Sequence, residues 1–133
     1  MVNIPFSPQK YDYIIIPGII YRTTKQVILD FLVDTGASTT MVDPRIMENL
    51  GYTPHCSEFL GHALVSSPAG TEAGYRIRTQ KLLVYSSECA VTNIDIVCIR
   101  PERNVEALLG LNFLKHFKYS VDHKKCVLTL EKN

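Results

Sequence analysis

The stretch that decides the fold of this chain is Phe31-Leu32-Val33-Asp34-Thr35-Gly36-Ala37-Ser38. Three apolar residues lead directly into Asp34, so this carboxyl group follows a predicted buried strand. Burial favours the protonated form of a carboxyl group, which makes such an acid a poor choice for structure alone. Gly36 permits a turn that a side chain would block, and the Thr35 hydroxyl can fix the loop through the backbone. A structural interpretation also remains, because Asp-Thr-Gly suits an Asx-type turn at the end of a strand.

The residues on either side of this stretch predict a mainly β domain. Residues 11–16 and 27–33 are rich in Ile, Val and Tyr, and the polar residues 22–26 between them are typical of a hairpin turn. Pro17 indicates an edge or a bend in the first of these strands. The remaining pattern predicts about eight strands in total. The further ones are expected near residues 63–65, 75–84, 94–99 and 126–131.

Two short helices are predicted within this β pattern. Residues 43–51 have Asp43 as a helix cap, Pro44 at the first helical position and Gly51 at the end. Residues 111–117 form the second predicted helix. A run of small residues at 66–74 separates two strands and predicts a long hairpin with a flexible tip.

Three of these motifs occur in an order that resembles the retropepsin-like aspartic proteases, and the cellular and microbial members most of all. The segment at 31–38 is similar to their active-site motif. The segment Leu-Leu-Gly-Leu-Asn-Phe-Leu at 108–114 is similar to their second signature, in which a Gly opens a short helix behind the Asp loop. Between the two lies the hairpin at 66–74, where the family places the flap that covers its substrate. The resemblance spans about residues 27–130 and implies a retropepsin-like closed β-barrel-type fold with two short helices and a flap hairpin, as a single domain over residues 1–133.

The resemblance also implies a function, that of an aspartic endopeptidase. The family mechanism uses two aspartates facing one water, whereas this chain has one Asp-Thr-Gly. It therefore implies a homodimer in which each subunit contributes Asp34, positioned by Thr35 and Gly36. The partners expected are a polypeptide substrate and a second copy of the chain. The substrate-binding residues implied in the same way are Ala37, Ser38, Ser67, Pro68, Ala69, Gly70, Leu108 and Leu109.

Three positions distinguish this chain within the wider family. Retroviral members place an Asp two residues after the motif Gly and pair it with an Arg just after the helix-opening Gly. Here these positions are Ser38 and Leu111, so that ion pair is absent. Pepsin-like members have Ser or Thr directly after the motif Gly, where this chain has Ala37, as viral enzymes do.

Composition argues against several other functions. With 14 Lys+Arg, 13 Asp+Glu and a net charge of +1, the chain has no clustered basic face, and a nucleic-acid partner is not expected. The longest apolar stretch, 13–21, is interrupted by Pro17 and Gly18 and is too short to span a membrane. The first ten residues lack a signal-peptide pattern. Cysteines at 56, 89, 98 and 126 without a Cys-x-x-Cys indicate reduced thiols and a cytoplasmic location.

Other reactive side chains have ordinary interpretations. The four histidines and four cysteines show no metal-ligand spacing, so neither a metal nor another cofactor is expected. Cys98 and Cys126 are predicted to be small buried hydrophobic residues. Asp95 is predicted to face solvent, and Asp122 to form a turn. Two alternatives stay open: a catalytically weak or inactive module that binds a peptide or dimerises, and a protease domain belonging to a longer chain.

Overall fold

The computed structural model describes residues 1–8, 13–68, 70–101 and 104–133 of the chain. Within these ranges the protein is mainly β, with two short helices, as the sequence predicts. The elements in chain order are β1 (Val2–Pro5), β2 (Ile15–Arg22), β3 (Lys25–Val33), β4 (Thr40–Val42), α1 (Pro44–Asn49), β5 (Phe59–Ser67), β6 (Gly70–Val84), β7 (Ala90–Cys98), β8 (Ala107–Leu109), α2 (Leu111–Leu114), β9 (Phe117–Asp122) and β10 (Val127–Lys132).

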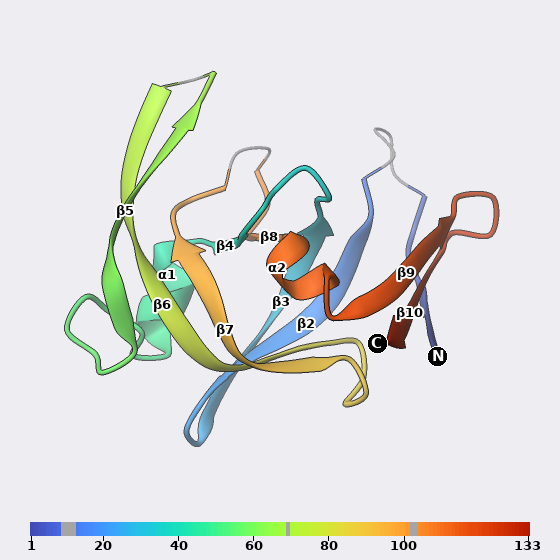
Figure 1. The fold of residues 1–133 in the computed structure, drawn as a ribbon, viewed down its shortest axis with the longest axis horizontal. Coiled ribbons are helices and arrows are strands. Elements are labelled where there is room, and N and C mark those ends of the chain that lie inside the picture. The colour runs from blue at the N-terminus through green and yellow to red at the C-terminus, as the bar shows by residue number, and fades with distance from the viewer. Residues whose placement is uncertain (9–12, 69, 102–103) are drawn as a thin grey trace.

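Six of the strands close into a barrel (Figure 1). They follow the order β2-β3-β8-β4-β7-β6, and β6 pairs back with β2 to complete the ring. Closure leaves these strands without a free edge. β5 lies outside the ring and pairs only with β6 among the described strands, so this hairpin extends beyond the body of the barrel. The predicted closed-barrel fold is confirmed.

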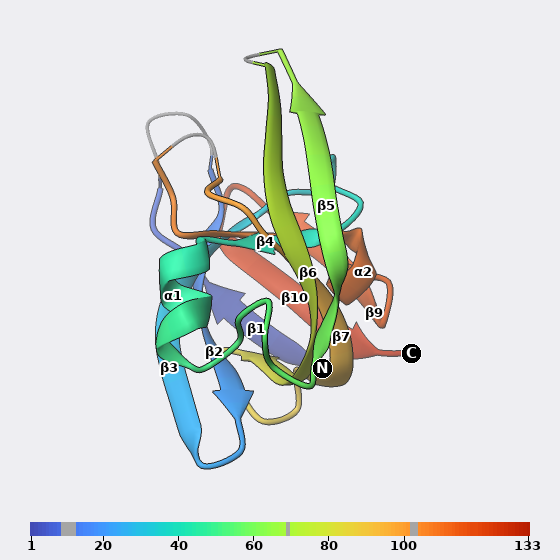
Figure 2. The ribbon, with the colours of Figure 1, turned by 90° about the vertical axis from the view of Figure 1, so that its left-hand side faces the viewer.

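The first and last strands form a second, three-stranded antiparallel sheet in the order β1-β10-β9. Val2 pairs with Leu130 and Pro5 with Val127, so the two ends of the chain lie side by side (Figures 1 and 2). Ile4, Leu128 and Leu130 point inward and are buried. This alternation attaches the sheet to the same hydrophobic core as the barrel.

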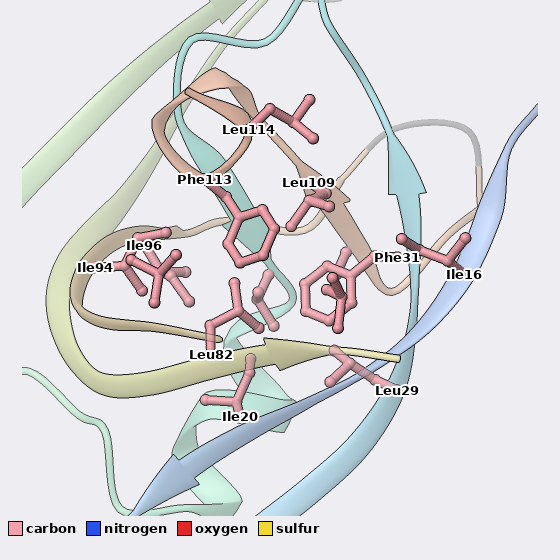
Figure 3. Packing of buried hydrophobic residues seen from close by; sticks show 14 of the residues in the cluster. Ile16, Ile20, Leu29, Phe31, Leu82, Ile94, Ile96, Leu109, Phe113 and Leu114 are labelled. Atoms are coloured by element: carbon pink, nitrogen blue, oxygen red, sulfur yellow. The ribbon is translucent and has the colours of Figure 1, made fainter. Parts of the chain in front are cut away.

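The core supports the end of the barrel where β3 and β8 finish (Figure 3). Phe31 of β3, Leu109 of β8 and Phe113 of α2 are all completely buried and belong to one hydrophobic cluster. Burial of each such side chain stabilises the fold by about 1.5–3 kcal/mol. The core thus anchors Phe31, three residues before Asp34, together with the ends of β8 and α2.

The strand predicted at residues 11–16 corresponds to β2, but its bounds differ. β2 begins at Ile15 and continues through Pro17 to Arg22, while residues 11 and 12 lie outside the described ranges. Pro17 stands where the β2–β6 ladder ends, since that pairing starts at Gly18. A residue without an N–H is tolerated at the end of a ladder, which is why the proline does not stop the strand.

The helix predictions are confirmed in part. Asp43 caps α1 by accepting a hydrogen bond from the Arg45 N–H, Pro44 opens the helix, and Gly51 adopts a positive φ of 89° just after it. The second helix is shorter than predicted. α2 ends at Leu114, and Phe117 begins β9, whose six-residue ladder with β10 holds it extended.

Two further predictions are wrong in part. The small residues 66–74 lie mostly in β5 and β6, because the two strands pair up to Ser67 and Gly70. Cys98 is fully buried, as predicted, but Cys126 is only half-buried and has a φ of 55° in the turn before β10. Asp122 does form a turn, since its carboxylate accepts from the Lys125 N–H at 3.0 Å.

Candidate active site

The loop that begins at Asp34 is held by the two strands beside β3. The Val33 N–H donates to the Ile14 carbonyl at 2.8 Å, and the Asp34 N–H donates to the Leu109 carbonyl at 3.0 Å. β3 runs parallel to β8, with Val33 opposite Leu109. The polar motif therefore starts where two neighbouring parallel strands end together, at one end of the barrel.

Within the loop, Asp34 organises its own turn. Its Oδ1 accepts a hydrogen bond from the Gly36 N–H at 2.9 Å, and its carbonyl accepts from the Ala37 N–H at 3.2 Å. A Cβ on residue 36 would lie 3.2 Å from that Oδ1, so glycine leaves room for the carboxylate. This is the Asx-type turn that the structural interpretation predicted. It also leaves Asp34 half-buried, with Thr35 and Gly36 exposed beside it.

The helix α2 packs directly behind this loop. The Leu111 N–H donates to the Ala37 carbonyl at 2.8 Å, and the Asn112 N–H donates to the Ser38 carbonyl at 3.1 Å. A Cβ on Gly110 would lie 2.6 Å from the Thr39 carbonyl carbon, closer than any side chain allows. The glycine of the second signature is thus required for the loop and the helix to touch.

A side-chain network that the sequence analysis missed joins these elements. Asn112 Oδ1 accepts from both the N–H and the hydroxyl of Thr40, each at 2.8 Å, and Asn112 Nδ2 donates to the Asp95 carbonyl at 2.7 Å. The Thr40 hydroxyl also accepts from the Gly110 N–H at 3.1 Å. Thr40 is completely buried. The sequence held two indications of this network: an amide, Asn112, two residues after Gly110, and a hydroxyl, Thr40, directly before the apolar pair Met41-Val42.

The other residues predicted for the site lie around the loop as follows. Ala37 is half-buried and Ser38 exposed, whereas Leu108 is half-buried and Leu109 completely buried in the core. Leu109 thus contacts the loop through its carbonyl while its side chain packs inward (Figure 3). Asp95, predicted to face solvent, is half-buried and pairs with Arg78 at 2.8 Å.

The β5–β6 hairpin rises from the same end of the barrel as the Asp34 loop (Figures 1 and 2). Pro68 and Gly70 at its tip are exposed, and Gly70 has a φ of 127°. Ser67 is the last residue of β5, and Ala69 lies outside the described residues. The segment expected to cover the substrate is therefore the tip of the β5–β6 hairpin.

The described part of the chain also bears on a cysteine nucleophile, a metal site and a membrane-spanning helix. Burial raises the pKa of the Cys98 thiol to about 12, so almost no thiolate forms at neutral pH. No group of three His, Cys, Asp or Glu side chains there is arranged to hold a metal ion. None of the helices described is long and apolar enough to cross a membrane.

Comparison with known proteins agrees with this geometry. Residues 23–116 match the family described as gag-polyprotein putative aspartyl protease. The chain belongs to this family. Comparison with curated proteins gives no match.

Among solved structures, the fold is similar to a retropepsin-like aspartic protease from Rickettsia conorii, with a TM-score of 0.66 and 20% identity over 97% of this chain and 88% of that one. The solution structure of Simian Foamy Virus (mac) protease matches with a TM-score of 0.49 and 15% identity, over 76% of this chain and 91% of that one. The retroviral protease-like domain of Ddi1 from Leishmania major matches with a TM-score of 0.47 and 19% identity, over 98% of this chain and 88% of that one. The retropepsin-like fold and family predicted from the sequence are confirmed.

Proposed function

We propose that this chain is an aspartic endopeptidase that hydrolyses peptide bonds as a homodimer, with Asp34 of each subunit forming the catalytic pair. The observation that carries the proposal is the half-buried Asp34 carboxylate at the end of β3, held by the Gly36 N–H in a chain with one Asp-Thr-Gly. One carboxylate cannot act at once as the base and the acid of the reaction. A symmetric dimer supplies the second.

The chemistry follows from bringing two carboxyl groups together. At a separation of about 3 Å they cannot both be ionised, so the pair shares one proton, which is the general behaviour of aspartic-protease carboxylate pairs. The ionised Asp34 takes a proton from a water molecule, and the protonated Asp34 donates to the carbonyl oxygen of the peptide bond. The water oxygen attacks the carbonyl carbon directly to give a tetrahedral diol, and no covalent enzyme intermediate forms. The C–N bond then breaks as the amine takes the proton held by the Asp34 that accepted it from water, and the other Asp34 takes back its proton from a diol hydroxyl.

The surrounding residues would bind an extended peptide. Ala37 and Ser38 form the floor of the groove, and the half-buried Leu108 contributes a side chain beside it. The tip of the β5–β6 hairpin, at residues 67–70, closes over the substrate as a flap. Strand-like pairing with backbone groups supplies much of the affinity in such sites. The four free cysteines support a reducing compartment such as the cytoplasm.

The experiment that tests this function is cleavage of a mixed peptide library by the purified protein. Asp34→Asn should reduce cleavage by at least about a thousandfold, because the amide cannot take a proton from water. Asp122→Asn, which alters an exposed turn carboxylate, is the matched control and should retain activity. Cleavage that survives in folded Asp34→Asn protein would contradict the proposal, and binding without cleavage by the unsubstituted chain would favour the alternative of a peptide-binding module.

The dimer is tested by mixing. Excess Asp34→Asn chains should reduce the activity of unsubstituted chains, since mixed dimers carry only one functional carboxylate. Specific activity should also fall on dilution as subunits separate. Activity strictly proportional to unsubstituted chain, whatever amount of Asp34→Asn chain is added, would mean that a monomer performs the reaction.

A further inference from the structure

A pocket of about 180 Å³ opens beside the strand that carries Asp34. It is lined by residues of β2 and β3 and by the segment that leads into β8. These are Ile15, Asp30, Leu32, Asn104, Val105 and Glu106.

The pocket is close enough to Asp34 to receive a neighbouring side chain of a bound peptide. Leu32 lies two residues before Asp34 on β3, which is about 7 Å along a strand. The segment 104–106 directly precedes β8, whose Leu109 carbonyl accepts from the Asp34 N–H. The end of β3 and the segment that leads into β8 occupy the same end of the barrel (Figures 1 and 2).

The wall formed by Glu106 is anchored independently of any ligand. The Glu106 carbonyl accepts from the Asp43 N–H at 3.0 Å, which fixes this segment to the residue that caps α1. On the opposite wall, Ile15 pairs with Leu32 across the β2–β3 ladder. Both walls are therefore positioned by the barrel.

The lining combines an apolar interior with two carboxylates. Ile15, Leu32 and Val105 supply the apolar part, and Leu32 is only 2% exposed. Asp30 and Glu106 are exposed, and neither carboxylate has a hydrogen bond or an ion pair with any residue that the structure describes. Among the lining residues that the structure describes, none is basic. A side chain with an aliphatic stem and a cationic end matches this arrangement, because it buries its methylene groups and keeps its charge at the rim.

We propose that this pocket selects a Lys or Arg side chain of the substrate close to the cleaved bond. The proposal rests on the proposed proteolytic function and adds the substrate class to it. Asp30 and Glu106 attract the cationic end, while Leu32 and Ile15 receive the stem. An acidic side chain is disfavoured at the same position by like-charge repulsion. In a symmetric dimer the pocket occurs twice, once on each side of the cleaved bond.

The test uses peptides that differ at one position at a time, carrying Lys, its uncharged analogue norleucine, or Glu. One set is cleavable, and kcat/KM is measured for each peptide. A second set has a central statine, a non-hydrolysable mimic of the tetrahedral state, and its Kd is measured by fluorescence anisotropy. The readout is the ratio of Lys to norleucine in each set, for the unsubstituted protein and for Asp30→Asn, Glu106→Gln and the double variant. Glu88→Gln, an exposed acid in the turn between β6 and β7, is the matched control.

Lys should be preferred at one or two positions near the cleaved bond, and the double variant should reduce that ratio about fivefold, since two exposed ion pairs each contribute modestly. Glu88→Gln should leave the ratio unchanged, and higher salt should lower it, because exposed pairs are screened. Cleavage without a Lys preference, or with a preference that the double variant retains, overturns the pocket assignment and leaves the proteolytic function standing. If no peptide is cleaved, the proteolytic function fails and the statine peptides still decide the pocket: equal or absent binding of the Lys and norleucine forms overturns it.

Discussion

The two ends of β3 are stabilised by different kinds of polar group. At the end that carries Asp34, the neutral side chains of Thr40 and Asn112 join the loop to α2 and β7. At the other end, beside the β2–β3 turn, the charged pair Arg22–Glu58 closes at 3.2 Å, with Gln80 donating to the same Glu58 carboxylate at 3.0 Å. The neutral network has no titrating member, so its contribution should not vary with pH. The contribution of the charged network to stability should vary with pH, because Glu58 titrates.

Position in the fold explains the difference. Thr40 is completely buried, and a buried ion at that place would pay a large desolvation cost. Arg22 and Glu58 keep 28% and 15% of their side-chain surface exposed, which makes a charged pair tolerable. A neutral network beside Asp34 also adds no fixed charge to the proposed catalytic pair. The end that carries Asp34 is therefore supported by neutral hydrogen bonds, and the hairpin end by a charged pair.

Removing the amide at the site end should have the largest effect. Asn112→Ala leaves the buried Thr40 N–H and hydroxyl without their acceptor and the Asp95 carbonyl without its donor. We expect a loss of about 3 kcal/mol in the free energy of unfolding. Urea denaturation at fixed protein concentration measures it. Asn112→Asp should not restore this stability, because it keeps an acceptor for Thr40 but places a carboxylate oxygen against the Asp95 carbonyl and a charge beside the buried Thr40. A loss below about 1 kcal/mol for Asn112→Ala would mean that the network does not support the loop.

The charged end should have the next largest effect, and its contribution should depend on pH. Burial alone would raise the pKa of Glu58, but hydrogen bonds from Arg22, Gln80 and Ser57 outweigh burial and hold it at about 2. Because the folded pKa is depressed, the stabilisation is complete above about pH 4.5 and is lost as the pH falls toward 2. Glu58→Gln should cost about 2 kcal/mol at pH 7, after allowance for partial exposure.

The comparison of the two ends is tested directly by repeating these denaturation experiments between pH 7 and pH 3. The difference between Glu58→Gln and the unsubstituted protein should shrink over this range, while that for Asn112→Ala should stay constant. A loss in Asn112→Ala that shrinks together with that in Glu58→Gln would show that the two ends do not differ in the way described.

A smaller effect is expected from the hydroxyl within the neutral network. Thr40→Val preserves the shape of the side chain but removes the acceptor for the Gly110 N–H and one donor to Asn112. The expected loss is about 1–2 kcal/mol. Combined with Asn112→Ala in a double-mutant cycle, the two losses should be clearly less than additive. Full additivity would show that Thr40 and Asn112 act separately.

The smallest effect should come from a charged pair that neither network uses. Arg78 and Asp95 pair at 2.8 Å, but their side chains are 53% and 37% exposed. Arg78→Ala should change the free energy of unfolding by less than about 0.5 kcal/mol, since solvent screens such a pair. The same urea measurement serves as a baseline for the Glu58 experiment. A loss as large as that of Glu58→Gln would mean that exposure does not explain the ranking.

The elements whose signals are local could be predicted from the sequence. Asp43, Pro44 and Gly51 determine where α1 begins and ends through caps that involve only near neighbours. The apolar run before Asp34 predicts β3 in the same way. The boundaries that were wrong depend on pairing with distant strands. Pairing of β9 with β10 keeps Phe117 in a strand, and pairing of β5 with β6 extends β5 to residue 67.

By itself, the sequence determined the class of the molecule: one Asp-Thr-Gly after an apolar strand, a second glycine motif after it, and therefore the retropepsin-like fold and family. Only the tertiary structure decided how these motifs meet. Thr40 and Asn112 are 72 residues apart and carry no local pattern, yet they are hydrogen-bonded. Asp30 and Glu106 are also far apart in sequence and line the same pocket. Caps and periodicity are encoded between near neighbours along the chain, whereas the contacts that shape the site exist only once the parallel pairing of β3 with β8 has brought distant segments together.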